Sequence, residues 1–198
     1  MRQFRPGPKK AEKILFGGKE IPFGPQLLFV ENQMANLIVS AEICEDVWSP
    51  VPPSIEAARE GAIILVNCSA SDETIGKDSY REELIKGQSA RLIAGYVYAN
   101  AGDGESTTDV VFGGHNIIAE NGTILKEAKR FANEMIVSEI DIFRLLSERR
   151  KKYNFPDNGR TSSSQSTVPH KCGRDSTYQK LCTDPFCSTE YGREGKAL

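Results

Sequence analysis

The chain has 198 residues and a mass of 21.9 kDa, which is enough for one full hydrophobic core and short for two large domains. Hydrophobic residues make up 39% of the chain and charged residues 26%, and the formal net charge of −2 gives no field that would recruit nucleic acid or anionic lipid. No apolar run approaches the roughly 20 residues that span a bilayer, the N-terminus has no apolar signal region, and five cysteines do not suit a secreted disulfide framework, so a cytoplasmic location is expected.

The first half of the chain alternates between strand-like and helix-like patterns. Short, β-branched apolar runs at residues 26–31 and 37–44 predict two strands that are separated by a polar turn. A short helix is expected over residues 55–60, because prolines precede it, Ser54 can cap its N-terminus and Gly61 can end it.

The middle of the chain continues this alternation. Residues 62–68 are apolar on both faces, which predicts a strand that is covered on two sides. The apolar residues of 79–94 recur at helical intervals with charges between them, which is typical of a helix with one buried face, and a strand over 96–99 follows. The segment 110–125 contains three apolar runs, and Asn121-Gly122 between the last two is a strong hairpin signal, so an antiparallel ribbon is expected.

One more strand and one more helix are expected after the ribbon. Residues 135–140 should form the strand, and Asp141 should cap a helix over 142–153. We expect the basic cluster Arg149-Arg150-Lys151-Lys152 to be a solvated helix end and not a binding patch. Alternating strands and helices together with an antiparallel ribbon favour a layered α/β domain.

The composition of the chain changes after Phe155. Residues 161–167 are of low complexity, and the remainder has no apolar periodicity. We therefore expect a folded unit over residues 1–158 and a tail over 159–198 that is disordered or aberrant, as a broken reading frame would produce.

Cys44 stands where a predicted strand must end. Glu45 follows it directly, so the thiol lies where the chain turns out of the sheet. A thiolate at such a turn is suited to acyl transfer, because turn amides can stabilise an oxyanion and a nearby base can take the thiol proton. Taken alone this signal is weak, since cysteines are commonly core residues, and Cys68 in its apolar strand is expected to be of that kind.

Several further motifs lie in register with Cys44. They are Ala41-Glu42-Ile43-Cys44-Glu45-Asp46-Val47-Trp48-Ser49-Pro50, Pro53-Ser54, Val66-Asn67-Cys68-Ser69-Ala70-Ser71, Thr74-Ile75-Gly76-Lys77, Gln88-Ser89-Ala90-Arg91, Ala94-Gly95-Tyr96-Val97-Tyr98-Ala99-Asn100-Ala101-Gly102, Gly104-Glu105-Ser106-Thr107-Thr108-Asp109 and Glu120-Asn121-Gly122. In order and spacing this series resembles the glutaminase domain of glutamine-dependent NAD synthetases, in the carbon–nitrogen hydrolase (nitrilase) superfamily. Several motifs in register are more specific than any single one.

The resemblance implies a four-layer α-β-β-α sandwich, of which this chain would be a partial domain. It also implies a Glu-Lys-Cys triad, in which glutamine acylates the cysteine, ammonia leaves and water frees glutamate. The ammonia would pass to a synthetase domain of the ATP-pyrophosphatase type, which converts deamido-NAD to NAD with ATP. The expected partners are L-glutamine, this synthetase domain and, in a full-length protein, further copies of the subunit.

Carried over position by position, the resemblance makes Cys44 the nucleophile and places Ser71 and Lys77 against the glutamine substrate. The family position at Lys77 is usually arginine, so a single ammonium would replace a planar fork. Glu45 is a candidate to orient the substrate amide, although a partly solvated turn carboxylate is a close alternative. No metal-binding or cofactor-binding residue is expected in this chain.

Two parts of the family pattern are missing from these 198 residues. The implied base glutamate and lysine precede the segment that matches Met1–Gly7, so little activity is expected from this chain alone, because triad residues act as a unit. Motifs of the types Ser-Gly-Gly-x-Asp-Ser, Gly-x-x-x-x-Gly-Lys-Ser/Thr and Gly-x-Gly-x-x-Gly do not occur. ATP and deamido-NAD are therefore expected to bind the synthetase domain.

Other candidate sites are weaker. A zinc cluster is disfavoured because the tight paired spacing of structural sites is absent from His170, Cys172, Cys182 and Cys187. His115 could pair with Cys44, but a hydrogen-bonded structural histidine is favoured. Residues 102–106 resemble a phosphate loop only in their glycines, so a turn with an acidic cap is simpler. Tyr96 and Tyr98 are expected to pack in a strand and not to contact a ligand.

Two other functions remain open from the sequence. The chain could belong to a stand-alone nitrilase-type amidase, for which a full-length enzyme would show no preference for glutamine. It could also be a non-catalytic remnant, as the missing glutamate and lysine suggest.

Overall fold

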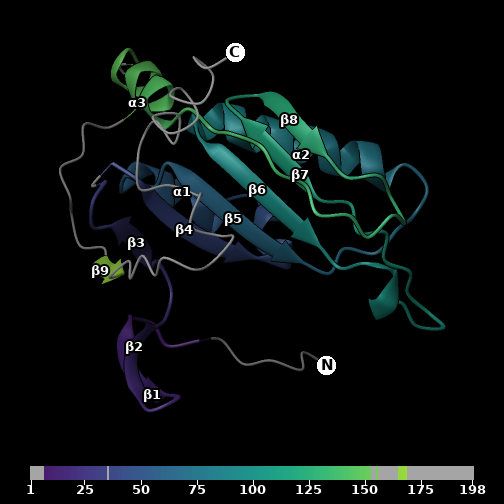
Figure 1. The fold of residues 1–198 in the computed structure, drawn as a ribbon, viewed down its shortest axis with the longest axis horizontal. Coiled ribbons are helices and arrows are strands. Elements are labelled where there is room, and N and C mark those ends of the chain that lie inside the picture. Colours follow the sequence, from purple (N-terminus) through teal and green to yellow (C-terminus); the bar gives the residue numbers. More distant parts are fainter. Residues whose placement is uncertain (1–6, 35, 153–154, 156–164, 169–198) are drawn as a thin grey trace, which may run out of the picture.

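The computed structural model describes residues 7–34, 36–152, 155 and 165–168. The strands are β1 (Glu12–Phe16), β2 (Lys19–Phe23), β3 (Leu28–Glu31), β4 (Ile38–Ile43), β5 (Ile64–Ser69), β6 (Gly95–Asn100), β7 (Ile117–Glu120), β8 (Thr123–Glu127) and β9 (Gln165–Val168). The helices are α1 (Pro53–Arg59), α2 (Lys77–Leu92) and α3 (Ile142–Arg150), with two 3-10 helices, η1 (Cys44–Trp48) and η2 (Asp103–Glu105). Figure 1 shows a central sheet, from which the β1–β2 hairpin stands apart.

Seven strands form the central sheet, in the order β8-β7-β6-β5-β4-β3-β9. The middle strands β4, β5 and β6 run parallel, whereas β3 is antiparallel to β4, and β7 and β8 are each antiparallel to the preceding strand. Parallel neighbours need crossover connections, which α1 and α2 provide here. The carboxyl ends of β4, β5 and β6 therefore meet at one edge of the sheet.

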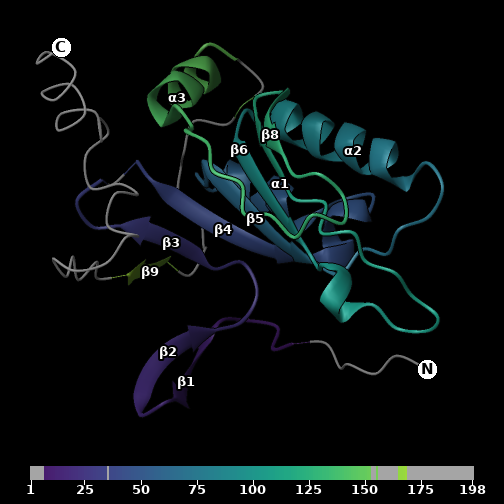
Figure 2. The same ribbon diagram turned by 45° about the vertical axis from the view of Figure 1, so that its right-hand side comes forward.

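Helices α1 and α2 cover the same face of the sheet (Figures 1 and 2). Side chains alternate along a strand, so Leu65 of β5 and its cross-strand partner Tyr96 of β6 point to one face. Both side chains are buried in a cluster that includes Ala58 of α1 and Ile85 of α2. This cluster is the main hydrophobic core, and it confirms that the helix predicted over 79–94 has one buried face.

The opposite face of the parallel strands is open toward their carboxyl ends. Ala41, Cys68 and Ala99 are exposed on it, and Ile43 is 63% exposed. The prediction that residues 62–68 form a strand covered on both sides is therefore wrong for one side, and Cys68 is not a core thiol. Within the described residues, one helical layer and one sheet of the expected four layers are present.

Local sequence signals placed two features correctly. Asn121 and Gly122 form the turn between β7 and β8, with φ values of 43° and 84°. Asp141 caps α3, because its Oδ1 accepts a hydrogen bond from the backbone N–H of Arg144 at 2.9 Å. The helix ends at Arg150, earlier than predicted.

Arg149 corrects the expectation of a solvated basic cluster. Its side chain is buried, and its guanidinium donates four hydrogen bonds of 2.8–3.1 Å to the carbonyl oxygens of Ala62, Leu92 and Ile93. The last carbonyls of a helix have no partner within the helix, and Arg149 supplies one at the end of α2. Residues 150–152 are exposed, as expected.

The strand predicted over residues 135–140 is absent. The segment forms no regular secondary structure and pairs with no described strand. Ile140 packs against Gly95, where an added Cβ would lie 2.8 Å from its Cδ1, and the backbone N–H of Asp141 donates to Glu120 Oε2 at 2.8 Å. The segment therefore lies over the sheet and not along its edge, so ladder pairing is impossible.

Two further predictions differ from the structure. Ser54 lies inside α1 and is not its N-cap, a position that Pro52 takes; the N–H of Ser54 instead donates to the buried carboxylate of Glu42 at 2.9 Å. Residues 110–112, which were expected to belong to the ribbon, form no strand. A single bond of 2.7 Å joins the Val111 carbonyl to the Glu73 N–H, and one bond does not make a ladder.

The β1–β2 hairpin was not predicted. Its turn is formed by Gly17 and Gly18, which both have positive φ. Leu15 is 75% exposed and Phe16 is 70% exposed. Because neither face of the hairpin is buried against a core, its sequence lacks the alternation of apolar and polar residues by which strands are predicted.

Of the predicted tail, only the backbone of β9 is described, and it lies parallel to β3. Residues 159–164 and 169–198, including the four candidate zinc ligands, lie outside the described residues. Among the described helices, none has the length and apolar character that crossing a membrane requires.

Candidate active site

Cys44 lies at the carboxyl edge of the sheet, directly after β4. Its backbone φ of 51° is in the left-handed region, which is uncommon for a residue with a side chain and produces a sharp turn into η1. The N–H of Ile43 donates to Asp46 Oδ2 at 2.8 Å, and Asn67 Nδ2 donates to the Cys44 carbonyl oxygen at 3.3 Å. The turn that carries the thiol is therefore held by its own helix and by the neighbouring strand.

Two of the predicted substrate-binding residues, Glu45 and Lys77, lie in or near the η1 helix. Glu45 of this helix is exposed, whereas the Trp48 ring packs on Tyr80 of α2 with ring centroids 5.2 Å apart. The Nζ atom of Lys77 lies 6.0 Å from the centroid of the Trp48 ring. Glu45 thus directly follows the candidate nucleophile in η1, whereas Lys77 lies near the last residue of that helix.

Lys77 forms an ion pair with Asp72 in this structure. This hydrogen bond is the main reason that the pKa of Asp72 lies below its usual value. The two side chains are 25% and 43% exposed, so the pair is screened by solvent and its partners can exchange.

Ser71 is buried where the chain leaves β5. Its N–H donates to Asn100 Oδ1 at 2.8 Å, and Asn100 Nδ2 donates to the Ser71 carbonyl at 3.0 Å. Arg81 Nη2 donates to Ser71 Oγ at 3.3 Å. Because a guanidinium can only donate, the Ser71 hydroxyl accepts there, and its own proton remains available for another acceptor.

Tyr98 places a second buried hydroxyl in the same neighbourhood. Its Oη makes no hydrogen bond within the described residues, although the side chain is 1% exposed. Burial raises the pKa of Tyr98, whereas the neighbouring hydroxyls of Ser69 and Ser71 and the charge of Arg81 oppose this rise. A buried polar atom without a partner costs about 1–3 kcal/mol, which a ligand atom could offset.

Tyr96 is the contrasting case on the same strand. Its hydroxyl donates to Glu42, whose other carboxylate oxygen accepts from α1. Burial first, and then the Glu42 carboxylate, raise the pKa of Tyr96 far above its usual value. Both tyrosines pack in the core as predicted.

Sequence reasoning missed several residues that hold Cys44 or Ser71 in place. A signal was present for Asn67 and Ser69, because polar residues two positions apart at the end of an apolar strand share one face. The same spacing relates Tyr98 to Asn100. Arg81 offered no such signal, since nothing local distinguishes it from the exposed charges of its helix.

His115 is a hydrogen-bonded structural histidine, as predicted. It is 1% exposed, its Nδ1 lies 2.7 Å from Arg81 Nη1 and its Nε2 lies 2.5 Å from Glu127 Oε1. The glycine-rich residues 102–106 form a turn that contains η2, as predicted, but no acidic side chain caps this helix, whose N-cap is Gly102. Within the described part of the chain, no group of histidines, cysteines and carboxylates could hold a metal ion.

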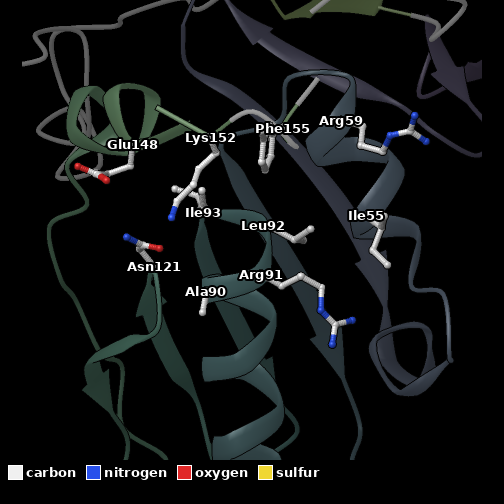
Figure 3. A pocket seen from close by; sticks show the side chains of 10 residues that line it. All are labelled: Ile55, Arg59, Ala90, Arg91, Leu92, Ile93, Asn121, Glu148, Lys152 and Phe155. Carbon is white, nitrogen blue, oxygen red and sulfur yellow. The ribbon is translucent and has the colours of Figure 1, made fainter. Parts of the chain in front are cut away.

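A hollow of about 460 Å³ lies away from Cys44. Figure 3 shows it between the end of α2, α1 and the residues after α3. It is lined by Ile55, Arg59, Ala90, Arg91, Leu92, Ile93, Asn121, Glu148, Lys152 and Phe155. None of the predicted site residues lines it, so the candidate site is the sheet edge and not this hollow.

Curated relatives and solved structures point to the same kind of protein, the glutamine-dependent NAD(+) synthetases. No family model matches the chain. The glutamine-dependent NAD(+) synthetase of Mycobacterium leprae is 45% identical over 161 residues, which make up 80% of this chain and 24% of that relative. The chain therefore spans about a quarter of the length of the curated relatives that it matches.

Solved structures show the same likeness. A glutamine-dependent NAD(+) synthetase from Cytophaga hutchinsonii matches with a TM-score of 0.54 and 27% identity, over 66% of this chain and 20% of that one. A carbon-nitrogen hydrolase from Helicobacter pylori G27 matches with a TM-score of 0.54 and 19% identity, over 66% of this chain and 48% of that one. The second likeness concerns the fold alone, and together they confirm the predicted nitrilase fold.

Proposed function

The chain belongs to the nitrilase superfamily as a partial domain related to glutamine-dependent NAD(+) synthetases, and we propose that it forms the nucleophile-bearing part of a glutamine-hydrolysing site. The observation that carries this proposal is the position of Cys44. It lies on a left-handed turn at the carboxyl edge of three parallel strands, with polar side chains from the next two strands around it.

In the proposed reaction, the Cys44 thiolate attacks the side-chain carbonyl carbon of glutamine. The tetrahedral intermediate collapses with loss of ammonia, after proton transfer to the leaving nitrogen, and leaves a thioester. Water then attacks the thioester, which releases glutamate and restores the thiol. The first N–H groups of η1 have no partners within that helix, so they are the available donors to the oxyanion.

The surrounding side chains suit the two ends of a glutamine molecule. Ser71 has a free hydroxyl proton for the α-carboxylate, and Lys77 can bind the same carboxylate if its ammonium leaves Asp72. Glu45 can accept a hydrogen bond from the substrate amide. The buried hydroxyl of Tyr98 offers one further polar contact.

The same proposal assigns partners outside these residues. Ammonia from glutamine would pass to a synthetase domain, and ATP and deamido-NAD would bind that domain and not this one. A cytoplasmic location, where thiols stay reduced, and self-association of a full-length protein are part of the proposal.

Thiol labelling tests this proposal more directly than turnover, because the implied base glutamate and lysine are not among the 198 residues. A diazoketone analogue of glutamine alkylates a thiol: the thiol proton moves to the diazo carbon, sulfur displaces N₂ and a thioether remains. We expect saturable labelling of Cys44, seen by mass spectrometry of peptides, and protection by L-glutamine.

Cys68 is the matched control. It is more exposed than Cys44, so a reagent without glutamine recognition, such as iodoacetamide, should modify Cys68 readily. Cys44→Ala should abolish labelling by the analogue, whereas Cys68→Ala should not change it. Labelling that persists in Cys44→Ala would exclude the proposal, and protection by simple aliphatic amides but not by glutamine would favour a nitrilase-type amidase.

A further inference from the structure

Arg81 is fully buried in α2, where a charge needs several partners. Its Nη1 donates to Glu73 Oε1 at 3.0 Å and lies 2.7 Å from His115 Nδ1. Its Nη2 donates to Ser71 Oγ and to the Asp72 carbonyl, both at 3.3 Å. One planar guanidinium therefore clamps the segment that carries Ser71.

The partners of His115 determine its tautomer. Arg81 can only donate, so Nδ1 must accept, and the ring proton is on Nε2. That nitrogen faces Glu127 Oε1 at 2.5 Å, and the carboxylate is 41% exposed. The ring is thus oriented from both sides, as an acceptor toward the interior and as a donor toward the surface.

The loop before β7 is shaped to let His115 reach Arg81. Gly114 has a φ of 63°, and a Cβ on Gly113 would lie 2.9 Å from the Glu73 side chain. A side chain at position 113 would push the loop away from the Arg81 partners. Charged groups around the ring come from the N-terminal part of α2, from the loop before it, from the end of β8 and from the residues after β8. They are Asp78, Arg81, Glu73, Glu127 and Arg130.

We propose that His115 and Arg81 are a positioning pair for glutamine binding. His115 and Glu73 fix the direction of Nη1, and because the guanidinium is planar and rigid, this aims Nη2 at Ser71 Oγ. The Ser71 hydroxyl then accepts from Arg81 and keeps its own proton to donate to the substrate carboxylate. This inference rests on the proposed function, since it assigns Ser71 the role of a glutamine contact.

The pair should affect glutamine recognition and not the reactivity of the thiol. In the full chain, labelling of Cys44 by the diazoketone analogue gives a half-saturating concentration and a limiting rate. For His115→Ala we expect the half-saturating concentration to rise about tenfold and the limiting rate to change less than about twofold, because a substrate hydrogen bond is lost without a change at sulfur. The rate at which iodoacetamide modifies Cys44 should stay unchanged, because this reagent does not depend on glutamine recognition.

A conservative variant separates this role from general packing. The amide of His115→Gln can accept from Arg81 through Oε1 and donate toward Glu127 through Nε2, so it should restore the half-saturating concentration to within about threefold of the wild type. Glu127→Ala changes a half-exposed residue and should not unfold the chain; a rise of about threefold is expected. Lys126→Ala, on the same strand and exposed, is the control without an effect.

The outcomes distinguish this inference from the function on which it rests. If the wild type is not labelled saturably and glutamine gives no protection, the proposed function fails and the pair has no substrate to position. If the wild type behaves as proposed, but His115→Ala and Glu127→Ala keep its half-saturating concentration, the positioning role is wrong. A fall in the limiting rate alone, or no rescue by His115→Gln, would overturn it as well.

Discussion

Asn67 donates from its side-chain Nδ2 to the backbone carbonyl oxygen of Cys44 over 3.3 Å. The same amide accepts a hydrogen bond of 2.7 Å from Ser69 Oγ through its Oδ1. The strained turn at Cys44 is thereby tied to β5, which is rigid because it is paired on both sides. A nucleophile on a left-handed turn needs such a tie, since its backbone conformation is unfavourable by itself.

Asn67→Ala should weaken both the fold and the geometry at sulfur. We expect a loss of about 1–2 kcal/mol in the free energy of unfolding, measured with urea, because the half-buried Cys44 carbonyl loses a donor. The limiting rate of Cys44 labelling by the glutamine analogue should fall by about tenfold. Ser69→Ala keeps the bond to Cys44 and is the matched control; an equal loss of rate in both variants would contradict this role.

Tyr96→Phe and Tyr98→Phe form a matched pair on one strand. Removing the Tyr96 hydroxyl leaves Glu42 Oε1 buried without its donor, and we expect a loss of about 1–3 kcal/mol in unfolding free energy. Removing the Tyr98 hydroxyl removes a buried atom that has no hydrogen bond in the described structure, so no loss is expected and the unfolding free energy should rise by up to about 1–3 kcal/mol. Urea denaturation checks both, and equal losses would show that Tyr98 has a partner.

Arg149→Ala should destabilise the chain although the residue belongs to a basic run. Four hydrogen bonds to three carbonyl oxygens disappear, and we expect a loss of about 2–3 kcal/mol. Arg150→Ala, one residue further and exposed, should change the stability by less than about 0.5 kcal/mol. Thermal unfolding by circular dichroism separates them. Burial lowers the pKa of Arg149 to about 10, so the charge is present throughout the neutral range.

Because Asp72 is paired with Lys77, we expect part of the free energy of unfolding to be lost at acid pH. The pKa of Asp72 lies below its usual value of 3.8, chiefly through its hydrogen bond with Lys77. A carboxyl whose pKa is lowered in the folded state contributes its full stabilisation above pH 3.8 and loses it as the pH falls through the folded-state value. In Lys77→Met, NMR titration should show the Asp72 pKa return toward 3.8. An unchanged value would mean that the ion pair does not persist in solution.

Sequence reasoning succeeded where the cause of a structure is local. The Asn121-Gly122 turn and the Asp141 cap depend on a few consecutive residues, and both were predicted correctly. The prediction of a solvated side chain for Arg149 was wrong because its hydrogen-bond acceptors lie 56–87 residues away in the sequence, at the end of α2 and before β5. The prediction of a core thiol for Cys68 was wrong because the sequence of an apolar strand does not reveal which of its two faces will be covered.

In the candidate site, too, features with a local cause could be predicted and features with a long-range cause could not. The sharp turn at Cys44 followed from a strand ending next to polar residues, and the structure places Lys77 near Trp48, the last residue of the helix that begins at this turn. The clamp formed by Arg81 and His115 could not be predicted, because it joins residues 34 positions apart through burial of a charge. Whether Ser71, Lys77 and Glu45 contact glutamine remains a prediction that the labelling experiments address.

The open face of the sheet has a calorimetric consequence. Ala41, Ile43, Cys68 and Ala99 are already in water before the chain unfolds. Newly exposed apolar surface is what gives unfolding its positive heat-capacity increment, which is about 12–15 cal/mol/K per residue in complete domains. The increment for this chain should lie below that range, so its stability curve against temperature should be flatter than that of a domain whose sheet is covered on both sides.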